Sequence, residues 1–362
     1  MVSIIYPYRN LEQERLDNSL ASLSLQDDKS FEVILVDYGS DDLHSKLLIE
    51  LISKYPFVKY IYSYTQYQIW SRSKALNIGI KNASFEILFT ADVDMIFTPD
   101  LVSFLIKEYK QDVVSCFKVA YLRKNFSFTN FPILEKNISN YSTSGAQGIL
   151  LFSKSKAFSV LGYDEFMHGW GSEDNDFVNR LLSENLEFNF IEDIFVYHQW
   201  HQNFSSFNDL KLTSKLAVMN IQGLNSYKYY KNKELNQITV NRNWGVVVSK
   251  NDYEKLNFPT LHLNIDNKIA SVDFLFNELM AINFGIVKII VKDLNTKTNA
   301  LSTLKNVIKK KSFKNRVFYD LKHINDQLLK FLFFKNILNY SLIIDVDSKS
   351  IELVYEKKAI IL

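Results

Sequence analysis

Short apolar runs alternate with amphipathic stretches through the first 120 residues of the chain. Strand-length runs of β-branched and aromatic residues occupy positions 2–6, 31–36, 58–62, 86–90 and 113–119. Stretches with apolar residues at helical spacing lie at about 12–25, 43–54, 73–80 and 101–109. Strands that alternate with helices form right-handed βαβ units, so the pattern predicts an α/β fold with a mostly parallel central sheet and flanking helices.

The pattern changes after residue 120. Residues 122–143 are rich in Asn and Ser and have weak periodicity, which predicts a long loop that covers the substrate. Apolar runs at 149–152 and 191–197 predict two further strands. Ser172 is expected to N-cap a helix that starts at Glu173.

The C-terminal third predicts a second, smaller α/β domain. Residues 228–237 are rich in Lys, Asn and Tyr, which indicates a helix end or linker. Strands are expected at 245–248, 286–291, 317–319, 342–345 and 351–355, and helices at 270–283 and 326–338. We therefore predict a first domain over residues 1–225 and a small domain of unknown role over residues 238–362.

Composition narrows the class of protein. The chain has 362 residues, of which 47% are hydrophobic, and its net charge of +2 gives no sign of nucleic-acid binding. Cys116 is the only cysteine, so we expect a reducing compartment. No signal-peptide pattern and no apolar run long enough to span a membrane occurs. A cytoplasmic protein is expected, with peripheral contact to the inner face of a membrane left open.

Two carboxylates follow the strand predicted at 86–90. Asp92 and Asp94 are separated by Val93 alone, and in an extended segment side chains two residues apart point the same way. Two carboxylates held together repel each other unless a proton or cation intervenes, and oxygen ligands suit Mg²⁺ or Mn²⁺. The pattern thus indicates a site for a metal and a diphosphate, although an acidic turn fits the same residues.

Other polar residues lie near predicted strand ends, where ligands bind in parallel sheets. Asp37 follows the second strand, while Arg9 and Lys74 are cations of the kind that bind a diphosphate. The alternative for Asp37 is a turn or helix cap, and Arg9 and Lys74 also fit plain surface charges.

An aromatic residue between two glycines precedes a cluster of acids. Trp170 lies between Gly169 and Gly171, and Glu173, Asp174 and Asp176 follow. Acidic residues favour the first turn of any helix, but that preference leaves the Gly-Trp-Gly string unexplained. An aromatic face that packs on a sugar ring beside a base explains the whole string. Farther on, His198 and His201 are placed to complete a metal shell with the Asp-x-Asp carboxylates, either singly or together.

Four stretches in this order resemble one enzyme family. They are Ile4-Ile5-Tyr6-Pro7-Tyr8-Arg9-Asn10, Arg72-Ser73-Lys74-Ala75-Leu76-Asn77-Ile78-Gly79, residues 89–97, and Gly169-Trp170-Gly171-Ser172-Glu173-Asp174-Asn175-Asp176. Together they resemble GT-A glycosyltransferases over about residues 2–205. The similarity is to the β-1,4-galactosyltransferase-like group and related bacterial family 2 enzymes.

The resemblance implies a Rossmann-like GT-A fold, a UDP-sugar donor and Mn²⁺ or Mg²⁺. It implies that Asp94 binds the metal with His198 or His201, that Asp174 is the general base and that Glu173 orients substrate hydroxyls. Asp92 would bind ribose or the donor sugar, and Trp170 would pack on the sugars. The remaining donor-binding residues that it implies are Pro7, Tyr8, Arg9, Asp37, Arg72 and Lys74.

The chain departs from the family pattern at two positions. His198 stands where family members often have Met, which hardens the metal site. Gly145 or Ala146 stands where vertebrate galactosyltransferases carry a bulky Tyr, so UDP-GalNAc is as suitable a donor as UDP-galactose.

The function expected from the resemblance is inverting, metal-dependent transfer of galactose or N-acetylgalactosamine to a hydroxyl of a glycan or lipid-linked saccharide. The alternatives are an inactive sugar-binding or scaffold protein on the same fold and a sugar nucleotidyltransferase. The last needs a glycine-rich loop after the first strand, and Tyr6-Pro7-Tyr8-Arg9-Asn10 has no glycine. A second Asp-x-Asp, Asp345-Val346-Asp347, lacks accompanying motifs and is predicted to be a turn. The role of the C-terminal domain stays open, and binding of the acceptor, of a membrane surface or of another subunit all fit it.

Overall fold

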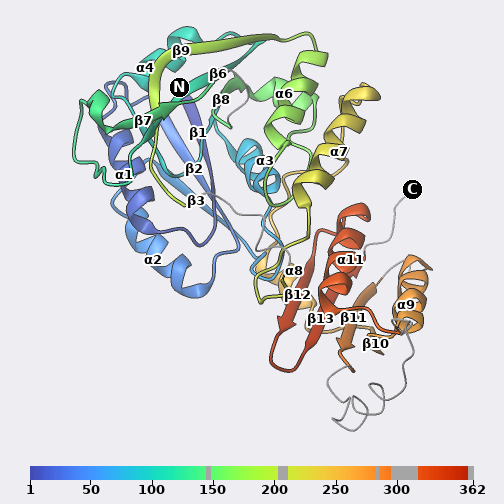
Figure 1. Ribbon diagram of the computed structural model, residues 1–362. Helices are drawn as coiled ribbons and strands as arrows, with labels where there is room; N and C mark the ends of the chain where they lie inside the picture. The colour runs from blue at the N-terminus through green and yellow to red at the C-terminus, as the bar shows by residue number, and fades with distance from the viewer. Residues whose placement is uncertain (144–147, 203–210, 282–284, 295–316, 358–362) are drawn as a thin grey trace, which may run out of the picture. The chain divides into compact units, whose positions relative to one another are not determined.

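The computed structural model describes residues 1–143, 148–202, 211–281, 285–294 and 317–357 (Figure 1). The chain divides into two compact units. The first, called the N-terminal unit here, comprises Met1–Gln66, Trp70–Phe204 and Ile221–Val247. The second, the C-terminal unit, comprises Tyr67–Ile69, Ser205–Asn220 and Val248–Leu362. The N-terminal unit thus includes residues 226–247, beyond the end of the first domain that the sequence analysis proposed.

The N-terminal unit is built on one sheet. Its strands are β1 (Val2–Tyr8), β2 (Phe31–Tyr38), β3 (Val58–Ser63), β4 (Ile87–Thr90), β5 (Met95–Phe97), β6 (Val113–Leu122), β7 (Ile138–Tyr141), β8 (Leu150–Ser153) and β9 (Glu187–His198). Their order is β3-β2-β1-β4-β8-β6-β9-β5, with β7 beside β6. Strands β1 to β4, β6 and β9 run in one direction, and β5, β7 and β8 run in the other. The predicted mostly parallel sheet is confirmed.

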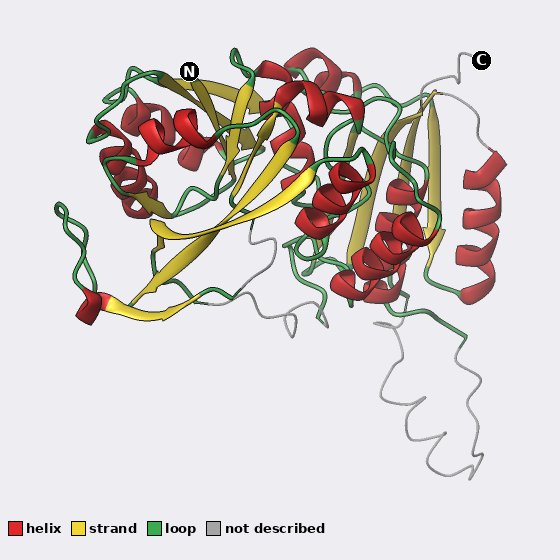
Figure 2. Ribbon diagram, turned by 90° about the horizontal axis from the view of Figure 1, so that it is seen from above, coloured by secondary structure: helices red, strands yellow, loops and turns green. Residues whose placement is uncertain are grey.

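Helices cover both faces of this sheet (Figure 2). They are α1 (Gln13–Ser24), α2 (Asp42–Ile52), α3 (Arg72–Asn82), α4 (Leu101–Glu108), α5 (Lys154–Ser159) and α6 (Glu173–Ser183). A further helix, α7 (Ile221–Glu234), contacts α6. Alternate residues of β1 enter different cores: Ile4 packs with residues of α1 and α4, whereas Ile5 packs with residues of α3 and α6. Burial on both faces explains why the strand is a continuous apolar run.

The segment between β6 and β8 differs from the predicted loop. It contains a 3-10 helix, η1 (Glu135–Asn137), and the strand β7. Phe128 and Ile133 pack with Leu122 and Ile96 in a small apolar cluster. Apolar side chains spaced irregularly along an Asn- and Ser-rich segment therefore anchor part of it to the sheet.

The C-terminal unit has a four-stranded sheet in the order β10-β11-β13-β12. Its strands are β10 (Leu261–Asp266), β11 (Gly285–Lys292), β12 (Tyr340–Asp345) and β13 (Ser350–Lys357), and its helices are α8 (Lys250–Lys255), α9 (Ile269–Ala281) and α11 (Leu321–Phe334). The strands predicted at 286–291, 342–345 and 351–355 are confirmed. Asp345 accepts a hydrogen bond from the Ser348 amide at 2.9 Å between β12 and β13, so the second Asp-x-Asp lies at a turn as predicted.

Two predicted strands of the C-terminal third were wrong. Residues 245–248 lie in a loop, because Gly245 has a φ of 60° and donates its amide to the Glu165 carboxylate at 2.7 Å. Phe318 forms only an isolated bridge with Lys268. A short apolar run is a strand only where a partner strand accepts its backbone, and sequence pattern does not show the partner.

Replacing Gly79 with Ala should destabilise the N-terminal unit. Gly79 lies within α3, and a Cβ there would overlap the Cγ2 methyl of the fully buried Ile5. In an exposed helix the same change stabilises by up to about 1 kcal/mol, whereas overpacking a core costs about 1–3 kcal/mol. We expect Gly79→Ala to lower the free energy of unfolding, measured by urea titration. Adding Ile5→Leu, which moves the methyl off Cβ, should recover part of the loss. A stabilised Gly79→Ala protein would contradict this packing.

Candidate active site

Arg72 joins three separate segments of the N-terminal unit. Its Nε donates to Asp92 Oδ1 at 2.8 Å and its Nη1 to Asp174 Oδ1 at 2.7 Å. Its Nη2 donates to the Gly148 carbonyl at 3.1 Å, and the side chain is 9% exposed. Burial alone would lower the pKa of Arg72, but Asp174 and Asp92 raise it well above its usual value. The guanidinium thus stays charged and links the loop after β4 to the first turn of α6.

Gly148 is shaped to this guanidinium. Its φ is 78°, and a Cβ would lie 2.6 Å from Arg72 Nη2 and 3.2 Å from Asp174 Oδ2. The Gly148 carbonyl also accepts from the Thr90 hydroxyl at 3.3 Å. Only glycine fits both the left-handed backbone and the close approach of Arg72. A glycine before an apolar strand was visible in the sequence, but its contact with Arg72 had no signal there.

Glu173 and Asp174 lie in the first turn of α6, where Glu173 is buried and Asp174 is partly buried. Burial, followed by the charge of Asp174, raises the pKa of Glu173 to about 7. Burial also raises the pKa of Asp174, while Arg72 opposes the shift. Asp174 Oδ1 accepts from Arg72, and its side chain is 16% exposed. The first turn of α6 therefore carries two adjacent acids: Glu173, with a pKa of about 7, and Asp174, which is held by Arg72.

The turn before α6 has an unusual backbone. Gly169, Gly171 and Ser172 have φ values of 69°, 106° and 73°. Ser172 precedes the helix as predicted, but it does not cap it, because in this left-handed conformation its hydroxyl bonds the Ser226 hydroxyl at 3.2 Å. The Asn225 amide on α7 donates to the Trp170 carbonyl at 3.4 Å. The turn thus leaves the Trp170 side chain 57% exposed beside the buried acids.

Asp176 does not join the site. It accepts from Arg180 Nε at 2.8 Å and from the Asn232 amide at 2.7 Å, and all three side chains are buried. Its charge is thereby used in the packing of α6 against α7.

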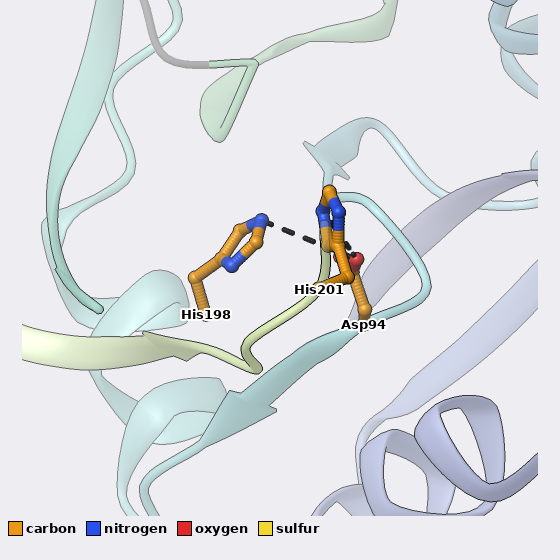
Figure 3. Close-up of side chains that lie close together, drawn as sticks. All are labelled: Asp94, His198 and His201. Atoms are coloured by element: carbon orange, nitrogen blue, oxygen red, sulfur yellow. Dashed lines mark ion pairs between the residues drawn. The ribbon is translucent and has the colours of Figure 1, made fainter. Parts of the chain in front are cut away.

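Asp94, His198 and His201 form a separate cluster (Figure 3). His201 Nε2 lies 3.4 Å and His198 Nε2 lies 4.0 Å from Asp94 Oδ2. Asp94 is 7% exposed, and its Oδ1 is buried with no hydrogen bond among the described residues. Burial raises the pKa of Asp94, while His198 and His201 lower it.

This donor set fits a divalent cation. One oxygen and two imidazole nitrogens lie within 4.8 Å of one another. Ligand atoms that share an ion about 2.1 Å away lie roughly 3–3.5 Å apart, so small rotations of the rings would suffice. Asp94 Oδ1, which has no hydrogen bond among the described residues, is a further possible ligand atom for a cation. Arg15 Nη1 on α1 lies 3.3 Å from Asp94 Oδ2 and supplies positive charge there. Nothing in the amphipathic pattern of its helix singles out Arg15.

The two aspartates of Asp-x-Asp point to different partners. Sequence reasoning assumed an extended segment with both carboxylates on one side, and this was wrong. Residues 93–94 form a turn, and the Met95 amide donates to the Asp92 carbonyl at 3.3 Å. As a result Asp92 contacts Arg72, whereas Asp94 faces the histidines.

The residues predicted to hold the nucleoside lie at the carboxyl ends of β1 and β2. The fully buried Asp37 accepts from the Ser40 amide at 2.7 Å and the Tyr60 hydroxyl at 3.0 Å, and burial raises its pKa. Pro7 and Tyr8 are buried in β1, and the Tyr8 hydroxyl donates to the Leu11 carbonyl at 2.9 Å. Arg9 donates to the Gln66 carbonyl at 2.6 Å. The side chain of Tyr8 is therefore directed to the loop after β1, and that of Asp37 to the loop after β2 and to Tyr60.

Lys74, which was predicted to lie with Arg72 near the diphosphate, does not join the Arg72 cluster. Lys74 is 7% exposed and buried near Glu165 and His168; burial lowers its pKa while Glu165 raises it. One helical turn thus directs Arg72 and Lys74 to different surroundings. Gly145 lies outside the described residues.

Comparison with known proteins identifies the class of the N-terminal region. Residues 3–161 match the family described as glycosyl transferase family 2, and residues 133–202 match the one described as N-terminal domain of galactosyltransferase. The chain is 36% identical over 117 residues to the uncharacterized glycosyltransferase YfnE of Bacillus subtilis (strain 168). That alignment covers 32% of this chain and 29% of YfnE, so the chain spans under a third of that relative.

Solved structures show distant similarity. S. aureus TarS 1-349 in complex with UDP-GlcNAc is 16% identical, with a TM-score of 0.45 and 71% of each chain covered. GalNAc-T7 with UDP, GalNAc and Mn²⁺ is 14% identical, with a TM-score of 0.44, covering 56% of this chain and 43% of the other. The family match and the sheet order agree with the GT-A fold expected from the sequence. Within the described ranges, no helix combines the length and apolar character needed to cross a membrane.

Glu173 should make stability fall as pH rises. Its pKa is about 7 in the folded protein against an ordinary value of 4.5, so between these values the native state holds a proton that the unfolded chain has lost. The free energy of unfolding should therefore drop by about 3 kcal/mol from pH 4.5 to above pH 7. Glu173→Gln should remove this part of the slope in urea titrations at pH 5 to 8. Glu192→Gln, at an exposed position, is the control and should leave the slope unchanged. Equal slopes in Glu173→Gln and wild type would contradict a raised pKa.

Proposed function

We propose that this chain, whose N-terminal region is a glycosyltransferase of the family 2 type, transfers galactose or N-acetylgalactosamine from a UDP-sugar to a hydroxyl of a glycan acceptor with inversion. One observation carries the proposal. Arg72 bonds both Asp174 on α6 and Asp92, and the turn that follows Asp92 presents Asp94 to His198 and His201, so the candidate base and the candidate cation site are linked through Arg72 and that turn. Inverting transfer needs these two elements, one on each side of the anomeric carbon.

Asp94, His198 and His201 would hold Mn²⁺ or Mg²⁺. When bound, the ion supplies positive charge that stabilises the leaving diphosphate. Two imidazoles with a single carboxylate suit Mn²⁺ better than Mg²⁺, which prefers oxygen ligands. Arg15 adds a fixed positive charge on the same side of Asp94.

Asp174 is the general base of the proposal. Its Oδ1 accepts a hydrogen bond from Arg72, whose charge opposes the rise in the pKa of Asp174 that burial causes, and Oδ2 is the proposed proton acceptor. The acceptor hydroxyl gives its proton to Oδ2 as its oxygen bonds the anomeric carbon, and the bond from that carbon to UDP breaks. One displacement at an α-linked UDP-sugar yields a β-glycoside. Glu173, half protonated near pH 7, is suited to hydrogen-bond a sugar hydroxyl as donor or acceptor.

The donor and acceptor rest on fewer observations. A small residue at position 145 or 146 supports a donor that carries an N-acetyl group. The match to the family described as N-terminal domain of galactosyltransferase supports galactose or a related sugar. The exposed ring of Trp170 is suited to pack on a saccharide. A glycan or lipid-linked saccharide is the proposed acceptor.

An inactive sugar-binding module is the alternative. Placing Asp92, Asp174 and the buried Glu173 around the buried Arg72 costs desolvation energy that apolar residues would avoid. A module without catalysis gains nothing from that cost. The buried cluster therefore favours an enzyme.

The first test is UDP release with Mn²⁺ from UDP-galactose, UDP-GalNAc, UDP-glucose and UDP-GlcNAc. We expect release from one of the first two donors and loss of release with EDTA, because Asp94 and the histidines need a cation to act on the leaving group. Full activity in EDTA would remove the metal from the proposal. Absence of both UDP release and metal-dependent UDP binding would favour the inactive module.

The second test separates chemistry from donor binding. Asp174→Asn should lower the turnover number about 10²–10⁴-fold, the usual contribution of a general base, while UDP binding measured by calorimetry changes little. The matched control is Asp345→Asn, which alters the Asp-x-Asp at the turn after β12 and should leave both quantities unchanged. Normal turnover in Asp174→Asn would exclude it as the base.

A further inference from the structure

A buried amide lies between the two histidines of the candidate metal cluster. Gln199 follows the last residue of β9 and is 7% exposed. Its backbone amide donates to the Asp94 carbonyl at 3.1 Å, and its side-chain Nε2 donates to the same carbonyl at 3.2 Å. Gln199, one of the two residues between His198 and His201 in sequence, therefore bonds the backbone of Asp94 twice.

The Gln199 side chain also bonds helix α1. Nε2 donates to the Arg15 carbonyl at 2.8 Å, and Oε1 accepts from the Asn18 amide at 2.9 Å. Two carbonyls on one side and an amide donor on the other fix which end of the Gln199 side chain is nitrogen. The amide thus ties α1, the turn before β5 and the segment after β9 to one point.

These contacts set the spacing of the cluster. Asp94 reaches the site from the turn before β5, and the histidines reach it from the end of β9, so no shared helix or strand holds all three. The β5–β9 pairing brings Met95 opposite His198 but does not include His201. Gln199 extends this pairing by one residue and fixes where the chain turns toward His201. Residues that orient metal ligands through hydrogen bonds usually affect affinity strongly.

We propose that Gln199 is a positioning residue that sets the divalent-cation affinity of Asp94, His198 and His201. The inference rests on the metal site of the proposed function and adds a residue that touches neither cation nor substrate. Its amide replaces rigid secondary structure as the link between ligands from two segments.

Gln26, which lies just after α1, offers a matched control because it also bonds the chain next to β5. It is 2% exposed, its Nε2 donates to the Thr98 carbonyl at 2.7 Å, and its Oε1 accepts from the Val102 amide at 2.9 Å. Like Gln199, it is a buried glutamine that bonds a carbonyl next to β5, but at Thr98, after the strand, rather than at Asp94, before it. Replacing either glutamine removes hydrogen bonds to backbone carbonyls in a buried place, but only Gln199 lies at the candidate metal cluster.

The experiment measures Mn²⁺ alone against the full chain, using the electron paramagnetic resonance signal of free Mn²⁺, together with the melting temperature. Gln199→Met should weaken Mn²⁺ binding about 10–100-fold, the range seen when partners of metal ligands are removed. Gln26→Met should lower the melting temperature by a similar amount while its Mn²⁺ affinity stays within about threefold of wild type. Asn18→Ala, which removes one hydrogen bond to Gln199, should weaken Mn²⁺ binding by about 2–10-fold and serves if Gln199→Met does not fold.

The outcomes separate this inference from the proposed function. Mn²⁺ binding by wild type with unchanged affinity in Gln199→Met, or in Asn18→Ala when only that variant folds, would overturn the positioning role and leave the metal site standing. Equal loss in Gln26→Met would show that general destabilisation, not position, weakens the site. Wild type that binds no Mn²⁺ would overturn both the metal site and the role of Gln199.

Discussion

The buried ion pairs of Arg72 are the interaction on which the candidate site depends. A single guanidinium faces Asp92 and Asp174, with Glu173 close enough to be coupled to the same charges. Three carboxyls around one arginine leave excess negative charge in a buried place, and the raised pKa of Glu173 is how the protein accommodates it. Loss of Arg72 would leave uncompensated carboxylates, so its charge determines whether the acids can be held together at all.

The turn at residues 93–94 divides the chemistry between two neighbouring groups. Because the backbone turns after Asp92, this residue stays with Arg72 and the acids of α6, while Asp94 faces the histidines after β9. An extended Asp-x-Asp would have placed both carboxylates in one site and increased their repulsion. The turn thus lets one short motif contact Arg72 through Asp92 on one side and the candidate metal cluster through Asp94 on the other.

Sequence reasoning predicted the elements that have strong local periods and the motifs that lie at strand ends. The central sheet and the turn at Asp345 follow from local sequence pattern, and the positions of Asp37 and Asp92 at the carboxyl ends of β2 and β4 follow the strand-end rule for parallel sheets. The contacts of Arg72 with Asp92 and Asp174 were not predicted. Sequence reasoning failed where contacts with residues distant in sequence determine the local structure. The left-handed φ of Ser172, the burial of Lys74 with Glu165 and the loop at 245–248 each depend on contacts with residues distant in sequence.

Gln199 illustrates the same limit at the level of function. Glutamine between two histidines carries no motif, because its role comes from Arg15, Asn18 and Asp94, which are distant in sequence. Burial is the main cause of the raised pKa of Asp94, Asp174 and Glu173, and the negative charge of Asp92 adds to each rise, so Asp92 acts on groups on both sides of the turn. A cation held by Asp94 would offset part of this repulsion and favour the ionised form of the acids on α6.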